Sequence, residues 1–141
     1  MNIIIPLGGL GKRFADEGFK NPKPLIKIDE KPMILWAIES LGTTGNYIFI
    51  LRKSFGSDRI KEVLEQTVKG CRIIEIDYLT EGPASTCLLA KEFINNEDEL
   101  IIANCDQIMW WNGDYFINSV DRKSTRLNSS HSSVSRMPSS A

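Results

Sequence analysis

Near its N-terminus the chain reads Ile3-Ile4-Ile5-Pro6-Leu7-Gly8-Gly9-Leu10-Gly11-Lys12-Arg13-Phe14, an apolar run that ends in a glycine-rich turn followed by two cations. A nearly continuous apolar run of this length predicts a strand that is buried on both faces of a sheet. Glycines let backbone N–H groups approach an anion closely, and the cations add positive charge. The stretch therefore predicts a strand followed by a polyphosphate-binding loop, although an ordinary strand-to-helix loop has a similar composition.

Spacing excludes two well-known phosphate motifs. A Walker A loop requires Gly and Ser/Thr at the positions that Pro6 and Arg13 occupy, and the dinucleotide fingerprint starting at Gly9 requires a glycine where Phe14 stands. A third cation, Lys23, follows in Asn21-Pro22-Lys23-Pro24-Leu25, where it is held between two prolines.

Strand and helix patterns alternate along the rest of the chain. Further strand-length apolar runs are Tyr47–Leu51, Arg72–Ile76 and Leu100–Ala103, and the first and last of these are nearly continuous, as in strands buried on both faces. Three helical patterns lie between these strands. The first opens at Pro32 and ends at Gly42. The second begins with a cap at Ser57 and carries Ile60, Val63, Leu64 and Thr67 on one face, and the third opens at Pro83 with Ala84, Cys87, Leu88 and Ile94 facing inward. This order predicts an α/β fold, a Rossmann-like three-layer sandwich with a mostly parallel sheet.

Three loops of this fold are expected at one edge, because ligands of open α/β sheets bind beyond the carboxyl ends of the strands. They are residues 8–31, 77–82 and 104–107. Asp106 directly follows a strand and is suited to Mg²⁺, which prefers one or two carboxylates plus phosphate oxygens and water; the alternative is a turn aspartate bonded to its own backbone. Gly82, before the helix start at Pro83, lets a planar group such as a base approach the backbone, and the alternative is a plain helix start.

Composition limits the classes of function. The chain has 141 residues, is 42% hydrophobic and has a net charge of −1, which suits one domain with a core and gives no basic field for nucleic acid. Residues 1–31 carry six Lys/Arg against four Asp/Glu, while residues 32–120 carry seven against thirteen, so positive charge gathers around the glycine loop. No signal peptide or membrane-spanning stretch is visible, which predicts a soluble, cytoplasmic protein with no membrane partner.

The cysteines and the histidine exclude several kinds of chemistry. Cys71, Cys87 and Cys105 are widely spaced, so neither a disulfide framework nor a zinc site is expected. The only histidine, His131, lies in the tail, so a Ser-His-Asp or Cys-His mechanism is not available to the folded part. That tail, residues 121–141, holds eight serines and no apolar periodicity. We expect it to be disordered and treat it as a non-native scar, outside a domain of residues 1–120.

The motifs, in this order, resemble the sugar-phosphate nucleotidyltransferase family (nucleoside-diphosphate-sugar pyrophosphorylases). The matching segments are Leu7-Gly8-Gly9-Leu10-Gly11-Lys12-Arg13-Phe14, Pro22-Lys23-Pro24-Leu25, Lys31-Pro32-Met33-Ile34, Glu81-Gly82-Pro83-Ala84 and the aspartate after a hydrophobic strand, Asp106. The resemblance covers about residues 1–118. Two positions depart from the family pattern, since Gly8 replaces the usual Ala and Lys12 the usual Thr/Ser.

The resemblance implies a role for each matching residue. It assigns nucleotide binding to Leu7, Gly8, Gly9, Gly11, Lys12, Glu81 and Gly82, phosphate neutralisation in catalysis to Arg13 and Lys23, and Mg²⁺ to Asp106. The implied reaction is attack of a sugar 1-phosphate on the α-phosphate of a nucleoside triphosphate, which releases pyrophosphate and forms an activated sugar. Positioning and charge neutralisation would carry this catalysis.

Family members continue well beyond this chain, into a half that supplies most of the sugar pocket. We therefore expect this chain to be the nucleotide-binding part of a longer enzyme, inactive or nearly so alone, with homo-oligomerisation possible in the intact parent. Two alternatives stay open: a non-catalytic nucleotide-binding module, and a related glycosyltransferase that consumes an activated sugar. Such glycosyltransferases commonly use Asp-x-Asp, and Asn104-Cys105-Asp106 supplies one acid, which weighs against the second.

Overall fold

The computed structural model describes residues 1–7 and 21–119, in two units that divide between Trp110 and Trp111. The elements of the first unit are β1 (Asn2–Leu7), η1 (Lys23–Leu25), β2 (Lys27–Ile28), β3 (Lys31–Pro32), α2 (Met33–Leu41), β4 (Asn46–Arg52), α3 (Ser57–Thr67), β5 (Arg72–Ile76), α4 (Pro83–Leu88), α5 (Lys91–Ile94) and β6 (Leu100–Ile102). The described part of the second unit holds α6 (Gly113–Ser119), and there the rings of Trp111 and Phe116 lie 4.9 Å apart. Within the described ranges, no helix is long and apolar enough to cross a membrane.

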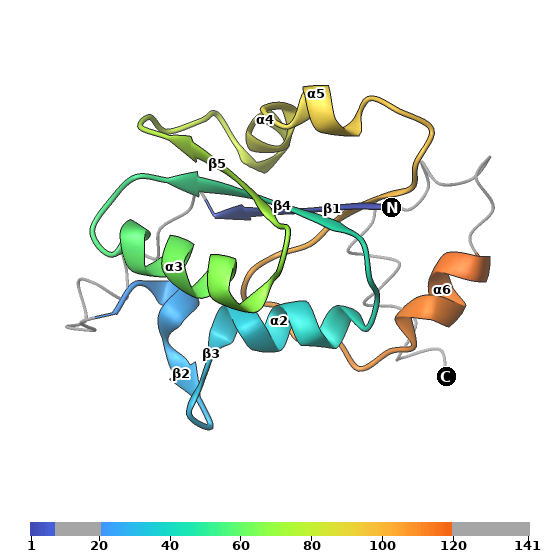
Figure 1. Ribbon diagram of the computed structural model, residues 1–141, viewed down its shortest axis with the longest axis horizontal. Helices are drawn as coiled ribbons and strands as arrows, with labels where there is room; N and C mark the ends of the chain where they lie inside the picture. The colour runs from blue at the N-terminus through green and yellow to red at the C-terminus, as the bar shows by residue number, and fades with distance from the viewer. Residues whose placement is uncertain (8–20, 120–141) are drawn as a thin grey trace. The chain divides into compact units, whose positions relative to one another are not determined.

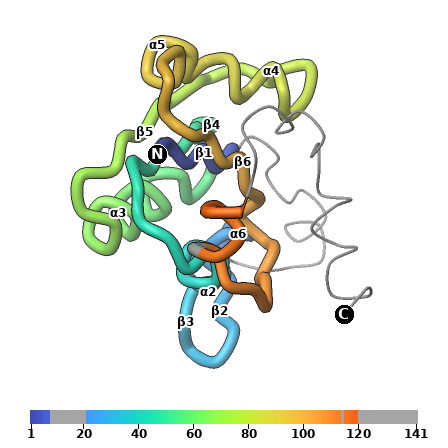
Figure 2. The backbone as a smooth tube through the Cα atoms, turned by 90° about the vertical axis from the view of Figure 1, so that its right-hand side faces the viewer, coloured from blue at the N-terminus to red at the C-terminus, as the bar shows by residue number. Residues whose placement is uncertain are grey.

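Four strands of the first unit form a parallel sheet in the order β5-β4-β1-β6 (Figures 1 and 2). The α/β class and the parallel sheet are confirmed, and the four predicted strands match within one residue at each end. In register, Ile4 of β1 lies opposite Ile48 of β4 on one side and Ile102 of β6 on the other. Strands β4 and β5 are added on one side of β1, and β6 is then added on its other side. The carboxyl ends of β1 and β6 therefore flank a topological switch point.

Helices cover both faces of this sheet, and its layers are visible in Figures 1 and 2. Towards α4 and α5 the sheet presents a buried cluster made of Ile4, Ile48, Ile50, Ile76, Cys87 and Ala90. Successive side chains of a strand alternate between faces. Ile3, Ile5 and Phe49 therefore point to the opposite face, which α2 and α3 cover, and each is 0% exposed.

The first two predicted helices are confirmed, with a correction at the start of each. Pro32, expected as the first helical residue, is instead the last residue of β3 and the N-cap of α2. Helix α2 ends at Gly42, whose φ of +60° is the left-handed conformation that terminates helices. The N-cap of α3 is Gly56 rather than Ser57, which is the first helical residue. The Ser57 hydroxyl instead accepts a hydrogen bond from the Ser54 backbone N–H at 3.2 Å, and so it closes the preceding turn. Thr67, expected on the apolar face, is exposed at the helix end.

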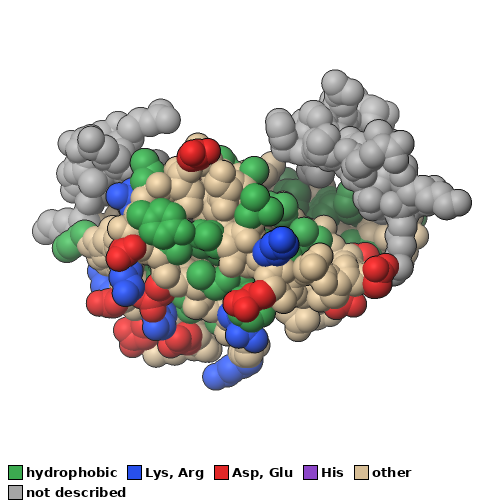
Figure 3. All heavy atoms as spheres, turned by 90° about the horizontal axis from the view of Figure 1, so that it is seen from above, with side chains coloured by type: hydrophobic (Ala, Val, Ile, Leu, Met, Phe, Trp, Pro, Cys, Tyr) green, Lys and Arg blue, Asp and Glu red, His purple; other side chains and the backbone are tan. Residues whose placement is uncertain are grey.

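The third predicted helix is two short helices, and its predicted inner face is partly wrong. Backbone bonds of the i to i+3 type join Leu89 to Thr86 (3.1 Å) and Ala90 to Cys87 (3.0 Å), and these tighten the chain between α4 and α5. This tightening rotates the buried side to Thr86, Cys87 and Ala90, while Leu88 is 66% exposed. Ala84 is exposed as well. Hydrophobic side chains are accordingly visible on the face shown in Figure 3.

Strand β6 is also more exposed than its apolar sequence predicts. It pairs with β1 at one edge of the four-stranded sheet. Leu100 and Ile102 are 42% and 56% exposed, because no further strand among the described residues covers them.

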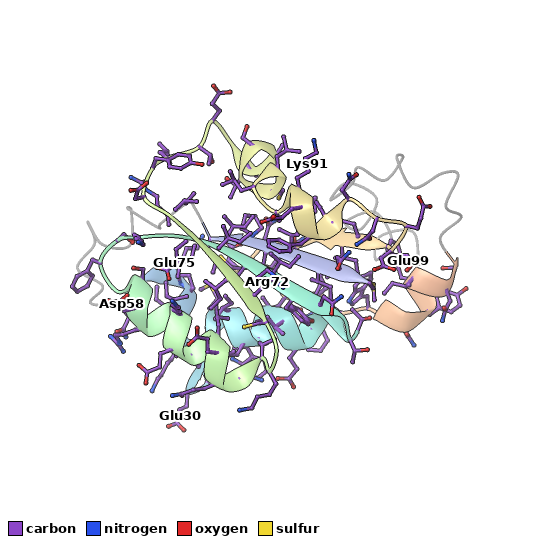
Figure 4. The ribbon with its side chains drawn as sticks, turned by 45° about the horizontal axis from the view of Figure 1, so that its top comes forward. Glu30, Asp58, Arg72, Glu75, Lys91 and Glu99 are labelled. Atoms are coloured by element: carbon purple, nitrogen blue, oxygen red, sulfur yellow. The ribbon has the colours of Figure 1, made fainter. Side chains whose placement is uncertain are left out.

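A small hairpin, β2–β3, was not predicted. Its two-residue turn consists of Asp29 (φ +49°) and Glu30 (φ +64°), so both central residues have left-handed backbone angles. Turns of this kind favour Asn-Gly or Asp-Gly, because glycine at the second position carries no steric penalty. The glutamate side chain lies at the exposed tip of the hairpin (Figure 4).

Replacing Glu30 by glycine is expected to stabilise the chain. A left-handed conformation costs a non-glycine residue about 1–2 kcal/mol, and glycine adds about 0.5–1 kcal/mol of unfolded-state entropy, so we expect a net gain of about 0.5–1 kcal/mol in the free energy of unfolding. Urea denaturation followed by circular dichroism measures this gain. The exposed Glu97, which has no positive φ, provides the control E97G, for which no gain is expected. An equal gain in both variants would contradict the strain argument.

Candidate active site

A pocket of about 270 Å³ lies beyond the carboxyl ends of β1, β5 and β6, at the switch point of the sheet. Its lining residues are Pro6, Lys23, Leu79, Thr80, Gly82, Pro83, Thr86, Asn104, Cys105 and Asp106. Three segments that are far apart in the sequence thus meet here, which are those that follow β1, β5 and β6. The predicted convergence of the three loops is therefore seen for the parts of them that the structure describes.

An ion pair between Lys23 and Asp106 lies in this pocket. The Lys23 Nζ is 2.5 Å from the Asp106 Oδ2, and the two side chains are 24% and 39% exposed. Lys23 begins the single turn η1, in which the Leu25 N–H donates to the Pro22 carbonyl at 2.9 Å. Asp106 follows β6, whose pairing with β1 extends to the bond from the Ala103 N–H to the Ile4 carbonyl at 2.9 Å. Each charge is thus placed by regular structure.

Gly82 and two threonines form another part of the pocket lining. The carbonyl of Gly82 accepts hydrogen bonds from the Thr86 hydroxyl (3.0 Å) and the Thr80 hydroxyl (3.2 Å), and these two hydroxyls are 2.5 Å apart. The φ of Gly82 is 171°, which is extended backbone that any residue adopts. A Cβ built on Gly82 meets no heavy atom within 4 Å in the described part of the chain. The absence of a side chain here therefore leaves space in the pocket.

Cys105 is the thiol in this pocket, and it is held neutral. Burial, together with the neighbouring Asp106 charge, raises its pKa to about 11. A thiol with this pKa is almost entirely protonated at neutral pH, and only the thiolate is a good nucleophile. At neutral pH Cys105 is therefore expected to line the pocket as an uncharged thiol.

The donor atoms fit Mg²⁺ held jointly with a ligand rather than by protein alone. No group of three or more His, Cys, Asp or Glu side chains in the described ranges is arranged so that it could hold a metal ion. The pocket offers the oxygens of the Asp106 carboxylate and of the neighbouring Asn104 amide. Mg²⁺ typically takes one or two carboxylates and completes its coordination with water and substrate phosphates, so this donor set is compatible with it.

The predicted site residues fall into three groups. Lys23, Gly82 and Asp106 line the pocket together. Leu7 is buried at the end of β1, and Glu81 is exposed next to Gly82, and neither is among the lining residues. Gly8, Gly9, Gly11, Lys12 and Arg13 lie outside the described residues.

Sequence reasoning missed Thr80 and Thr86, whose hydroxyls line the pocket and support Gly82. The available signal for Thr86 was its spacing, since it lies four residues after Gly82 and so one helical turn away.

Comparison with known proteins identifies a matching family model and related proteins. The sequence model of the MobA-like NTP transferase domain matches residues 3–111. The catalytic subunit beta of mannose-1-phosphate guanylyltransferase from Xenopus tropicalis is 31% identical over 112 residues, which are 77% of this chain and 31% of that protein. The chain therefore spans about a third of the length of this curated relative.

Solved structures agree on the fold. The nucleoside-diphosphate-sugar pyrophosphorylase from Vibrio cholerae RC9 aligns over 74% of this chain and 47% of its own, with a TM-score of 0.61 and 24% identity. The inositol-1-phosphate CTP transferase from T. maritima aligns over 86% of this chain and 49% of its own, with a TM-score of 0.67 and 15% identity. On the match over residues 3–111, the chain belongs to the MobA-like NTP transferase domain family.

Proposed function

We propose that the pocket binds a nucleoside triphosphate with Mg²⁺, as the nucleotide site of an enzyme that transfers a nucleotidyl group to a sugar 1-phosphate. The observation that supports this most is the Lys23–Asp106 ion pair inside a pocket at the switch point. A Mg²⁺–triphosphate carries both signs of charge, so it offers phosphate oxygens to the ammonium and a cation to the carboxylate. The charges of the Mg²⁺–triphosphate are thus complementary to those of Lys23 and Asp106.

The proposed roles follow from this match. Lys23 neutralises phosphate oxygens, Asp106 contributes a ligand to Mg²⁺, and Gly82 leaves space for the planar base. Family resemblance adds Arg13 to the phosphate contacts, and Leu7, Gly8, Gly9, Gly11, Lys12 and Glu81 to the nucleotide contacts. When bound, Mg²⁺ would supply charge neutralisation on the phosphates.

The reaction needs no nucleophile from the protein. A phosphate oxygen of the sugar 1-phosphate forms a bond to the α-phosphorus, the bond from that phosphorus to the bridging oxygen of the β-phosphate breaks, and pyrophosphate leaves with the electron pair. A neutral Cys105 in the pocket agrees with this scheme. Positioning and electrostatic stabilisation are the main contributions of the protein in phosphoryl-type transfers.

Two assays on the chain test the proposal. Calorimetric titration with nucleoside triphosphates, with and without Mg²⁺, is expected to show binding that Mg²⁺ strengthens, and Asp106→Asn is expected to remove most of this Mg²⁺ dependence. Pyrophosphate release with a panel of sugar 1-phosphates then separates the classes of protein. Pyrophosphate supports nucleotidyl transfer by the chain itself, and binding without turnover supports a nucleotide-binding part that requires the remainder of a longer enzyme. Absence of triphosphate binding overturns the proposal.

Gly82→Ala is expected to separate folding from binding. Because φ is extended and the Cβ has open space, the variant should fold as well as the native chain or slightly better, by about 0.4–1 kcal/mol from reduced unfolded-state entropy. A methyl group in the space left for the base should weaken nucleotide binding about tenfold, equivalent to roughly 1.4 kcal/mol. Thermal denaturation and titration measure the two effects on the same sample.

Inorganic pyrophosphate provides the internal control for Gly82→Ala, because it has phosphates and no base. Its affinity should not change in this variant if Gly82 faces the base. An equal loss for pyrophosphate and nucleotide would contradict that placement of the base.

A further inference from the structure

The two residues that precede Lys23 are held against the start of α3, which is a contact between segments about 35 positions apart. Arg59 Nη1 donates a hydrogen bond to the Asn21 Oδ1 at 3.0 Å. The ring of Pro22 lies over the Cα of Gly56, so a Cβ built on Gly56 would be 2.8 Å from Pro22 Cγ and 2.9 Å from Pro22 Cδ. Real Cβ atoms essentially never approach heavy atoms this closely. In Figure 4, Asp58 marks this first turn of α3.

Gly56 is itself part of a hydrogen-bonded corner between β4 and α3. The N–H of Ser54 donates to the Ser57 hydroxyl at 3.2 Å, and the N–H of Ser57 donates back to the Ser54 carbonyl at 3.1 Å. The N–H of Lys53 donates to the Ile76 carbonyl at 2.7 Å, which ties the corner to the neighbouring strand β5. A Cβ on Gly56 is therefore accommodated by movement of Pro22 rather than of the corner.

On its other side, the turn that carries Lys23 is anchored to the core. Leu25 is 4% exposed, and the Met33 N–H at the start of α2 donates to the Ile26 carbonyl at 2.8 Å. The turn is thus fixed at Leu25 and Ile26 and supported at Pro22, with Lys23 between the two supports. A shift of the Pro22 ring is passed directly to the next residue, whose Nζ makes the 2.5 Å contact with Asp106.

We infer that Gly56 is a positioning residue for the phosphate-binding site, because its missing side chain lets Pro22 hold Lys23 in place. This inference rests on the proposed function, in which Lys23 contacts phosphate. Gly56 has no contact with the pocket and acts through Pro22 alone. Any residue with a Cβ at position 56 moves the ammonium away from its place beside Asp106.

A matched pair of glycine variants tests this. Gly56 (φ +80°) and Gly70 (φ +75°) have nearly the same positive φ, but a Cβ on Gly70 meets no heavy atom within 4 Å in the described ranges. Gly56→Ala and Gly70→Ala therefore both place an alanine at a similar positive φ, and only the first adds the clash with Pro22. We expect Gly56→Ala to weaken Mg²⁺–triphosphate binding roughly tenfold and Gly70→Ala to leave it unchanged, since small misplacements of a contact group cause losses of this order.

Rescue by a second substitution gives a readout that a purely structural defect would not give. Pro22→Ala removes Cγ and Cδ, which are the two atoms closest to the added Cβ. The double variant Gly56→Ala/Pro22→Ala should therefore bind triphosphate more tightly than Gly56→Ala alone, although two substitutions ordinarily add their losses. If Gly56→Ala does not fold, Pro22→Ala alone, which removes the ring atoms that rest on Gly56, is expected to weaken triphosphate binding about threefold, because Lys23 then loses its support on that side.

The outcomes distinguish this inference from the proposed function. If the native chain does not bind triphosphate, the proposed function fails. If the native chain binds and Lys23→Met weakens binding, but Gly56→Ala binds as tightly as Gly70→Ala, the positioning role of Gly56 is wrong and the proposed function stands. Where Gly56→Ala does not fold, a Pro22→Ala variant that binds like the native chain leads to the same conclusion.

Discussion

Lys23→Met is expected to weaken binding of a Mg²⁺–triphosphate about 10- to 100-fold. A hydrogen bond to a charged group contributes about 1.5–3 kcal/mol, and this range converts to that loss of affinity. Methionine keeps the length and apolar stem of lysine, so the turn η1, which is held by backbone bonds and by buried Leu25, should persist. Calorimetric titration measures the loss.

Lys27→Met is the matched control for Lys23→Met. Lys27 is exposed on the short strand β2, four residues further along, and it does not line the pocket. Both variants remove one positive charge, so a difference between their affinities comes from the position of that charge and not from long-range attraction. The affinity of the native chain and of the Lys27 variant should also fall more steeply with added salt than that of the Lys23 variant, because one phosphate contact is missing in the last. Equal affinities of the two variants would contradict the role given to Lys23.

Much of the fold was predictable because the sheet is parallel and buried. Strands covered on both faces are nearly continuous apolar runs, as in Ile3–Leu7 and Tyr47–Leu51, and these are visible without knowledge of tertiary structure. The hairpin β2–β3 was not predictable in this way. Its strands have two residues each, and its turn places Glu30 in a left-handed conformation that glutamate rarely adopts, so neither periodicity nor turn composition indicates it.

The candidate site was predictable in its location and not in its contacts. Parallel strands end at the same edge, so the segments containing Lys23, Gly82 and Asp106 were expected to converge, and these three residues line one pocket. The 2.5 Å ion pair between Lys23 and Asp106 depends on strand register and on the turn η1, which sequence spacing does not encode. The support of Gly82 by two threonine hydroxyls is likewise a tertiary arrangement.

The support of Pro22 by Gly56 shows why such contacts escape sequence reasoning. A glycine between a strand and a helix is typical of a turn, and the positive φ of Gly56 is by itself a sufficient reason for glycine at this position. Its second role, as the surface on which Pro22 rests, becomes visible only when the two segments are placed together. Local conformation and tertiary contact thus require the same residue for different reasons.

Phe49→Ala is expected to have the largest effect on stability, a loss of about 3–5 kcal/mol in the free energy of unfolding. Phe49 is 0% exposed in the middle of β4, where it lies between Ile5 of β1 and Ile73 of β5, and its ring stacks on Tyr47 at 6.0 Å. Removal of the ring leaves a cavity that a sheet paired on both sides cannot close. Since domains of this size have a stability of about 5–15 kcal/mol, the loss should lower the melting temperature by on the order of 10–30 °C.

The chain offers an equal substitution without burial as the control. Phe55 is 85% exposed in the corner between β4 and α3, so Phe55→Ala removes the same atoms from a site where they pack against little. We expect its effect to stay within about 0.5 kcal/mol, as for most surface substitutions. Urea denaturation of both variants, followed by circular dichroism, gives the comparison. Similar losses in the two variants would mean that β4 is not the central buried strand, and the position of the pocket at the end of its neighbour β1 would then lose its structural basis.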